Sequence, residues 1–483
     1  MPKRPNVILI VADDMGYGDF GLFNDGPART SCLDELATQG VCLSQHYAGS
    51  PVCSPSRAAL LTGRYPHRTG ALTPMEVRGM DRIALDEETI GDVFKRSGYS
   101  TGLIGKWHNG ALDKRYHPNA RGFDEFFGFC GGWMDYFDWC VDRNGRRETA
   151  DGRYLTDVFT DEAVDFVTRH RHDSFLLSVM YNAPHTPLQA PDDVIQPYID
   201  AGLSTGVAIT YAMNEIMDRG IARIVETLDE LGLAEDTILM FTSDNGPAFS
   251  LAGRPDQVPE GVSTDLRRYN CGFNGAKGSV YEGGIRVPMI IRWPGGLERC
   301  RQVKEMVHGV DWLPTLAALC GIKCLVGRSL DGRNASKVLH GECNASPARF
   351  WQLNQFEPVG WINAAMREGA WKLVRPRVAQ RPKTEADERF MERYTELDIK
   401  YKYHPDEVTE LMSEPAPNLI TSPPGEIELY HIENDPLEKI NLAISEPERT
   451  GRMLGELQAW FEDVEAERQR IQPDGSIWEI VDD

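Results

Sequence analysis

The stretch NVILIVADD, residues 6–14, decides the fold. Its first part is apolar over five consecutive residues, 7–11, and contains several β-branched side chains. It lacks the polar alternation of a strand with one face in water, and such a run is typical of a parallel strand covered on both faces. The run ends at Asp13 and Asp14. We therefore expect a buried strand with two carboxylates at its carboxyl end.

Helical and strand patterns alternate after this stretch. Helical patterns cover residues 33–38, 56–62, 89–97, 155–170 and 207–231, and apolar strand patterns cover residues 101–104, 175–181, 237–242 and 289–293. This alternation predicts an α/β fold in which helices sandwich a mostly parallel central sheet. Ligands in such folds bind beyond the carboxyl ends of the strands.

The pattern changes after a helix predicted at residues 311–320. Antiparallel strands are predicted at 349–355, at 364–375 with a turn at Glu368-Gly369, and at 426–431, before a helix at 446–470. We expect a larger α/β domain, residues 1–345, which would carry the functional site, and a smaller C-terminal domain of antiparallel sheet plus helix, residues 346–483. The charged, proline-containing stretch 380–424 is predicted to be a surface insertion.

The composition limits the class of protein. With 483 residues, 41% hydrophobic and 26% charged, the chain is typical of a soluble globular protein. Its net charge of −22 disfavours nucleic acid and anionic membranes as partners. No apolar stretch is long enough to span a bilayer, and the first residues do not have the pattern of an export signal. The ten cysteines are irregularly spaced, which fits free thiols better than a disulfide framework. We expect a cytoplasmic protein, or a periplasmic one if a leader was removed.

A second informative stretch is CSPSRAALLTG, residues 53–63. Pro55 suits the first turn of a helix and Gly63 suits its end. Cys53 would then lie at a helix N-terminus, where free N–H groups and the helix dipole favour negative charge. Taken alone, a single cysteine is more often a small buried apolar residue.

Two polar pairs follow predicted strands. Asp13 and Asp14 follow the first strand, and Asp244 and Asn245 follow the strand at 237–242. If the two strands are neighbours, these side chains converge, and their mutual repulsion calls for a cation. Hard oxygen donors favour Ca²⁺ or Mg²⁺ over zinc. The alternative is that each pair only forms a turn or a helix cap.

The segment from Cys53 to Arg57, continued by LTGR at residues 61–64, resembles the signature of the formylglycine-dependent sulfatases. The resemblance continues in order through residues 6–21, 105–108, 183–187, 243–246, 277–284 and 428–430. It implies an alkaline phosphatase-like fold and oxidation of Cys53 to formylglycine by a formylglycine-generating enzyme. The aldehyde hydrate then attacks sulfur, the alcohol leaves, and sulfate is eliminated.

The resemblance also implies roles for individual residues. Arg57 orients the hydrate, Lys106 and Lys277 bind sulfate, and His108 holds or deprotonates the hydrate, with Asp244 as the alternative proton acceptor. His185 contacts sulfate and protonates the leaving oxygen, a task suited to a side chain that titrates near neutrality. One Ca²⁺ is bound by Asp13, Asp14, Asp244, Asn245 and the modified Cys53. In extended chain, Lys106 and His108 would point the same way.

Substrate residues are less defined by the sequence. Asn109 stands where the family commonly has an apolar residue, so we expect it to affect specificity. An aromatic cluster at residues 133–139 contains Trp133 and Asp135 and is either core packing or the wall of a sugar-binding pocket. Asn109, Trp133 and Asp135 are the candidate substrate contacts.

The expected function is hydrolysis of a sulfate ester, plausibly on a carbohydrate. A phosphonate monoester or phosphodiester hydrolase with the same nucleophile is the nearest alternative, because tetrahedral phosphorus makes similar demands. A noncatalytic binding protein that keeps Cys53 unoxidised is a further alternative, and the full set of charged residues argues against it.

Overall fold

In the computed structural model, residues 4–24, 26–324, 326–342 and 346–471 are described. A ten-stranded sheet has the order β11-β2-β10-β9-β1-β8-β4-β5-β6-β7. Its five central strands are mutually parallel: β9 (Thr237–Ser243), β1 (Asn6–Ala12), β8 (Phe175–Met180), β4 (Ser100–Lys106) and β5 (Glu125–Phe129). Antiparallel or short strands flank them: β10 (Met289–Arg292), β2 (Val41–Leu43), β11 (Arg301–Val303), β6 (Cys140–Arg143) and β7 (Arg146–Thr149). The predicted mostly parallel α/β sheet is confirmed.

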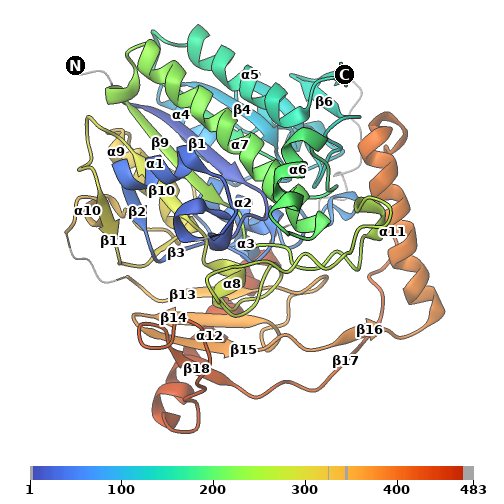
Figure 1. Ribbon diagram of the computed structural model, residues 1–483. Helices are drawn as coiled ribbons and strands as arrows, with labels where there is room; N and C mark the ends of the chain where they lie inside the picture. The colour runs from blue at the N-terminus through green and yellow to red at the C-terminus, as the bar shows by residue number, and fades with distance from the viewer. Residues whose placement is uncertain (1–3, 25, 325, 343–345, 472–483) are drawn as a thin grey trace.

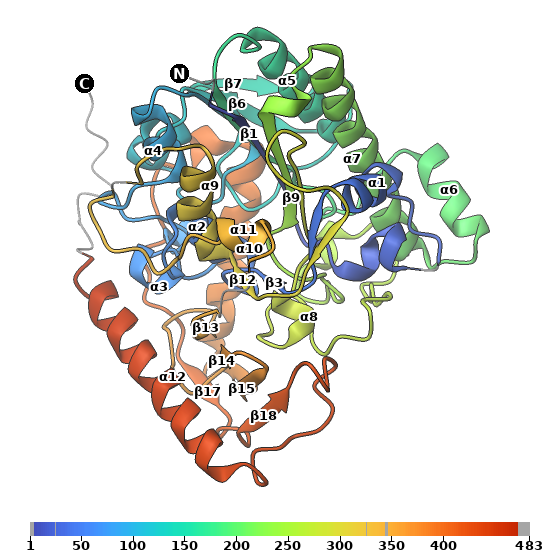
Figure 2. The same ribbon diagram turned by 90° about the vertical axis from the view of Figure 1, so that its left-hand side faces the viewer.

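The sheet has helices on both faces, and the side chains of strand β1 alternate between the two cores on those faces. Ile8 and Ile10 face a core built with α1 (Ser31–Gln39), α5 (Leu155–Arg169) and α7 (Thr205–Glu230). Val7 and Leu9 face a second core built with α2 (Cys53–Thr62), α4 (Ile90–Arg96) and α9 (Trp312–Leu319). Figure 1 shows α5 and α7 across one face of the sheet, and Figure 2 shows α4, α9 and α2 on the opposite side from α7 and α1.

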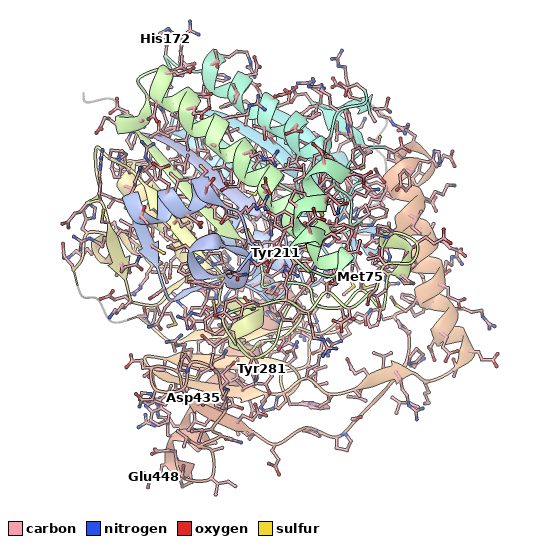
Figure 3. All side chains as sticks on the ribbon, in the orientation of Figure 1. Met75, His172, Tyr211, Tyr281, Asp435 and Glu448 are labelled. Atoms are coloured by element: carbon pink, nitrogen blue, oxygen red, sulfur yellow. The ribbon has the colours of Figure 1, made fainter. Side chains whose placement is uncertain are left out.

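A separate antiparallel sheet lies below the large one (Figure 1). Its order is β13 (Arg349–Gln352), β14 (Ala364–Glu368), β15 (Trp371–Arg375) and β18 (Glu428–His431), and α12 (Pro447–Arg468) packs on it. The predicted C-terminal sheet and helix are therefore confirmed, whereas the boundary at residue 346 stays a prediction. Figure 3 labels Tyr281 where the large domain meets this sheet, and its hydroxyl donates to Glu428 Oε2 at 2.6 Å.

The stretch predicted to be a surface insertion is more ordered than expected. It contains β16 (Gln380–Pro382), α11 (Glu385–Tyr403) and β17 (Leu419–Thr421). Helix α11 stands beside the large domain, away from the C-terminal sheet (Figure 1). Phe390 and Tyr394 of α11 pack with Met75 and Val77, and Figure 3 labels Met75 on that side of the molecule.

The remaining strands and α-helices of the described chain are short. They are β3 (His46–Tyr47), paired with β12 (Val307–His308), and the helices α3 (Pro66–Thr69), α6 (Asp192–Asp200), α8 (Glu282–Ile285) and α10 (Ser336–Leu339). Within the described ranges, none of the helices combines the length and the apolar character needed to cross a membrane. The nine cysteines in these ranges are free thiols, and Cys343 and the end of the predicted second domain, residues 472–483, lie outside them.

Candidate active site

Four adjacent parallel strands deliver most of the predicted site residues to one edge of the sheet. Strand β1 leads into Asp13 and Asp14, β9 into Asp244 and Asn245, β4 into Lys106 and His108, and β8 into the loop that carries His185. The order β9-β1-β8-β4 makes these strand ends neighbours. The expected convergence of the two polar pairs follows from the direct pairing of β1 with β9.

Helix α2 brings Cys53 to the same edge. Cys53 is the first residue of α2, and all ten residues of the helix are buried. Gly63 ends the helix in the left-handed conformation at φ +69°, as its sequence position predicts. Burial alone raises the pKa of the Cys53 thiol, but the charges of Lys106, His108 and Lys277 outweigh it and lower the pKa. Position 53 is therefore built to stabilise a negative charge.

Each carboxylate of the site is paired with a cation. Lys106 Nζ lies 2.5 Å from Asp13 Oδ2, and Lys277 Nζ lies 2.8 Å from Asp14 Oδ2. Arg57 Nε donates to Asp244 Oδ2 at 2.8 Å. These cations offset the repulsion between the carboxylates at the neighbouring strand ends. Two lysines beside Cys53 also leave the pocket suited to an anion.

The oxygen donors fit a hard divalent cation. Asp13 Oδ1 and Asn245 Oδ1 are buried and have no hydrogen-bond partner within the described chain, which is costly unless a ligand engages them. Ligand atoms of Asp13, Asp14 and His185 lie within 4.8 Å of one another. Burial, and then repulsion by Asp13, raise the pKa of Asp244 to about 6. A divalent cation would relieve both the unpaired oxygens and the repulsion.

His108 does not follow the extended path that its spacing from Lys106 predicts. Strand β4 ends at Lys106, and His108 has φ +52°, a region that is unfavourable for residues other than glycine. Its Nε2 lies 3.2 Å from Pro74 O and 3.6 Å from Glu76 Oε2. The two side chains nevertheless both act on Cys53, because each lowers its pKa. The extended chain assumed in predicting a shared direction for the two side chains is therefore not present at His108.

His185 is held by its loop. Its Nδ1 lies 2.8 Å from the carbonyl oxygen of Thr186, so Nδ1 carries a proton and donates it there. Nε2 is left facing Asp14 Oδ2 at 3.8 Å. The hydroxyl of Tyr136 donates toward the His185 carbonyl oxygen at 2.8 Å. The imidazole therefore presents Nε2 to the cavity.

A cavity of about 440 Å³ opens over these groups. Cys53, His108, His185, Lys277 and Asp14 line its floor. Its volume is in the range of small-molecule sites. Because its polar groups converge on a buried cysteine, we regard this cavity as the candidate active site.

The three candidate substrate residues are placed differently. Trp133 lines the cavity. Asn109 is fully buried outside it, and its amide donates to Ser54 O at 3.0 Å. Asp135 accepts from backbone N–H groups of its own turn and from Gln189 Nε2 at 2.7 Å. Asn109 and Asp135 are therefore not placed to contact substrate here; they brace α2 and the aromatic loop.

A charged wall of the cavity was not predicted from the sequence. Glu76 accepts from Gly132 N at 2.8 Å and pairs with Lys402 of α11, which also lies 3.0 Å from Asp398 Oδ1. Asp398 Oδ2 accepts from Trp133 Nε1 at 2.9 Å and from Arg254 Nη1 at 3.0 Å. Burial raises the pKa of Asp398. Burial also acts to raise the pKa of Glu76, but Lys402 and His108 together outweigh it and hold that pKa well below the ordinary value.

Comparison with known proteins agrees with this geometry. A model of the sulfatase family matches residues 5–322. The steryl-sulfatase of Mus musculus is 32% identical over 461 residues, which cover 77% of this chain and 70% of the relative. The chain belongs to the sulfatase family. This sulfatase is accordingly a sulfuric ester hydrolase, and the family resemblance of its motifs is confirmed.

Other similar proteins have saccharides in their names or titles. The N-acetylgalactosamine-6-sulfatase of Homo sapiens is 34% identical over 366 residues, covering 70% of this chain and 66% of the relative. The solved structure of Ps i-CgsB in complex with k-i-k-neocarrahexaose has a TM-score of 0.77 and 28% identity, and covers 99% of this chain and 97% of that one. A model of the C-terminal region of N-sulphoglucosamine sulphohydrolase matches residues 273–376.

Proposed function

We propose that this sulfatase removes sulfate from a carbohydrate by means of a formylglycine at position 53. The observation that carries the proposal is the convergence of Cys53, Lys277 and two histidines on one cavity, with the buried Lys106 and a set of oxygen donors beside them. The saccharide substrate is supported by the similarity to an N-acetylgalactosamine-6-sulfatase and to a structure solved in complex with k-i-k-neocarrahexaose. A formylglycine-generating enzyme would be required to mature the chain.

The cation site is proposed to bind one Ca²⁺. Asp13, Asp14, Asp244 and Asn245 would bind it, together with the side chain at position 53. Unpaired buried oxygens on Asp13 and Asn245 support this set. When bound, the ion would draw charge from a sulfate oxygen, and the formylglycine hydrate would supply the nucleophilic oxygen.

The chain's own residues supply the rest of the chemistry. Lys106 and Lys277 bind the sulfate oxygens and stabilise the charge that spreads over them in the transition state. His108 Nε2 faces the acceptors Pro74 O and Glu76, so Nδ1, which has no hydrogen-bond partner in the described chain, would hold or deprotonate the hydrate. Burial lowers the pKa of His108, but the charge of the Cys53 thiolate outweighs it and raises the pKa to about 9; formylglycine lacks that charge, and Asp244 is the alternative proton acceptor. His185 Nε2 faces the cavity, but burial and then Lys277 hold the pKa of the imidazole well below its ordinary value, not near neutrality, so Nε2 carries no proton in the free enzyme. The negative charge of the bound sulfate ester would raise that pKa, so that Nε2 gains the proton that it donates to the leaving alcohol oxygen. Arg57 holds Asp244 in place.

One preparation tests the nucleophile and the reaction together. Mass spectrometry of the peptide that ends at Arg57 should show an aldehyde or its hydrate in place of the Cys53 thiol. The same sample should hydrolyse an aryl sulfate much faster than a phosphonate monoester, and a panel of sulfated mono- and oligosaccharides should identify a preferred saccharide. Full activity in a sample with only thiol at Cys53 would contradict the proposed nucleophile, and faster turnover of the phosphonate would favour the alternative reaction.

A further inference from the structure

A second, larger cavity adjoins the active-site cavity. It measures about 650 Å³. Pro74 and Gln355 line both cavities. Val52 and Gly278 of the second cavity are the chain neighbours of Cys53 and Lys277 in the first. A substrate whose sulfate lies at Lys277 can therefore extend into the second cavity without leaving the protein surface.

The two cavities differ in charge. Asp14, Glu76 and Asp398 line the first one beside its cations. Among the described residues that line the second cavity there is no carboxylate, and Arg377 is its single charged side chain. The other polar lining groups are neutral, and include Thr73, Gln355 and Gln380. In a chain with a net charge of −22, a cavity without carboxylates is suited to an anion.

Arg377 is available to a ligand. Its side chain is exposed, and within the described part of the chain no hydrogen bond or ion pair engages its guanidinium. Its Nη1 lies 3.8 Å from the position that a Cβ on Gly278 would occupy, so it reaches over the backbone next to Lys277. A guanidinium binds sulfate and carboxylate groups with paired N–H donors.

The position of Arg377 relative to Lys277 is fixed by Asn363. This side chain donates from Nδ2 to Gly278 O at 2.9 Å and accepts at Oδ1 from Val280 N at 3.2 Å. Asn363 immediately precedes β14, whose Ala364 pairs with Arg375 of β15. The C-terminal sheet therefore sets the separation of the two cations.

We propose that the second cavity binds a neighbouring sugar that carries a second anionic group, a sulfate ester or a uronate carboxylate, through Arg377. The inference rests on the proposed function and makes the substrate class a multiply charged acidic oligosaccharide. Arg377 would then determine specificity and take no part in the chemistry at position 53.

The test compares Arg377→Ala and Arg377→Lys with the wild type on three substrates: the preferred saccharide, its derivative without the second charge, and an aryl sulfate. We expect Arg377→Ala to raise KM for the preferred saccharide by about tenfold or more, with kcat unchanged, and to spare the other two. Arg377→Lys should give a KM for the preferred saccharide between those of the wild type and Arg377→Ala. Arg381→Ala removes an exposed cation outside the cavity and should change nothing.

Derivatives that lack the second sulfate, or in which the uronate is reduced to the alcohol, identify which anion Arg377 binds. If the preferred saccharide carries a single charge, or if Arg377→Ala acts equally on all three substrates or on none, the inference is wrong while the sulfatase reaction stands. If the wild type hydrolyses no sulfate ester, the proposed function fails and the inference fails with it.

Discussion

Lys277 and Trp133 line the same cavity, but they can contact different parts of a substrate. Lys277 lies beside Asp14 at the strand ends, whereas the Trp133 ring is near two cations: its centroid is 5.3 Å from Arg254 Cζ and 5.7 Å from Lys402 Nζ. The lysine is therefore placed at the floor, where sulfate would bind, and the ring forms part of the wall. A small aryl sulfate needs the floor, and a saccharide needs both.

Lys277→Ala should lower turnover of an aryl sulfate and of the preferred saccharide alike, by about 10²- to 10³-fold, because it removes charge from the transition state. Trp133→Ala should lower kcat/KM mainly for the saccharide. Steady-state kinetics on both substrates measure the difference, with Trp133→Phe as a variant that keeps a ring and Lys383→Ala as a surface control. If Lys277→Ala spares the aryl sulfate, the lysine does not bind sulfate.

Single residues show how far the sequence could predict the site. Asp13, Asp14, Asp244 and Asn245 were predictable as a group, because parallel strands place their carboxyl ends at one edge. Asn109 was not, because nothing in its spacing shows that its amide turns back to Ser54 O. Glu76 was missed for a related reason: its partner Lys402 is 326 residues away in the chain.

Helix α11 shows the same limit at the scale of an element. The charged stretch around it predicts an exposed insertion, but its buried residues are Asp387, Phe390, Tyr394, Asp398 and Lys402. They repeat at helical spacing, but three of the five are charged, so the charged residues conceal the apolar stripe of Phe390, Tyr394, Leu397 and Tyr401. The helix is anchored by this packing and by ion pairs of Lys402 with Glu76 and of Asp398 with Arg254, whose partners lie far away in the sequence.

Replacing Lys402 should release α11 from the active-site wall. Lys402→Met leaves Glu76 and Asp398 buried without their shared cation, which costs about 3–5 kcal/mol for a broken buried pair. We expect faster hydrogen exchange and faster proteolysis in α11, and a greater loss of kcat/KM for the saccharide than for an aryl sulfate. Lys400→Met removes an exposed lysine from the same helix and is the matched control. Unchanged exchange in Lys402→Met would show that apolar packing alone holds the helix.

At the scale of the molecule, a buried charge cluster joins the C-terminal sheet to the large domain. Lys372 of β15 lies 2.9 Å from Glu282 Oε1 of α8 and 2.8 Å from Glu438 Oε1. All three side chains are buried, so two carboxylates share one ammonium group. Burial and repulsion by Glu282 outweigh Lys372 and raise the pKa of Glu438 to about 7.

This raised pKa predicts how stability depends on pH. The ordinary glutamate pKa is about 4.5, so between pH 4.5 and 7 the folded protein keeps a proton on Glu438 that the unfolded chain has lost. The contribution of this group to the free energy of unfolding therefore falls as pH rises through that window, and it is lowest above pH 7.

Because Glu438→Gln leaves one carboxylate for one ammonium, it should remove this dependence of stability on pH. From pH 5 to pH 8 the wild type should lose about 1–3 kcal/mol more stability than the variant, measured by denaturant unfolding, with Glu433→Gln as the exposed control. Parallel pH profiles for the wild type and Glu438→Gln would mean that Glu438 is ionised throughout and that Lys372 suffices for both carboxylates.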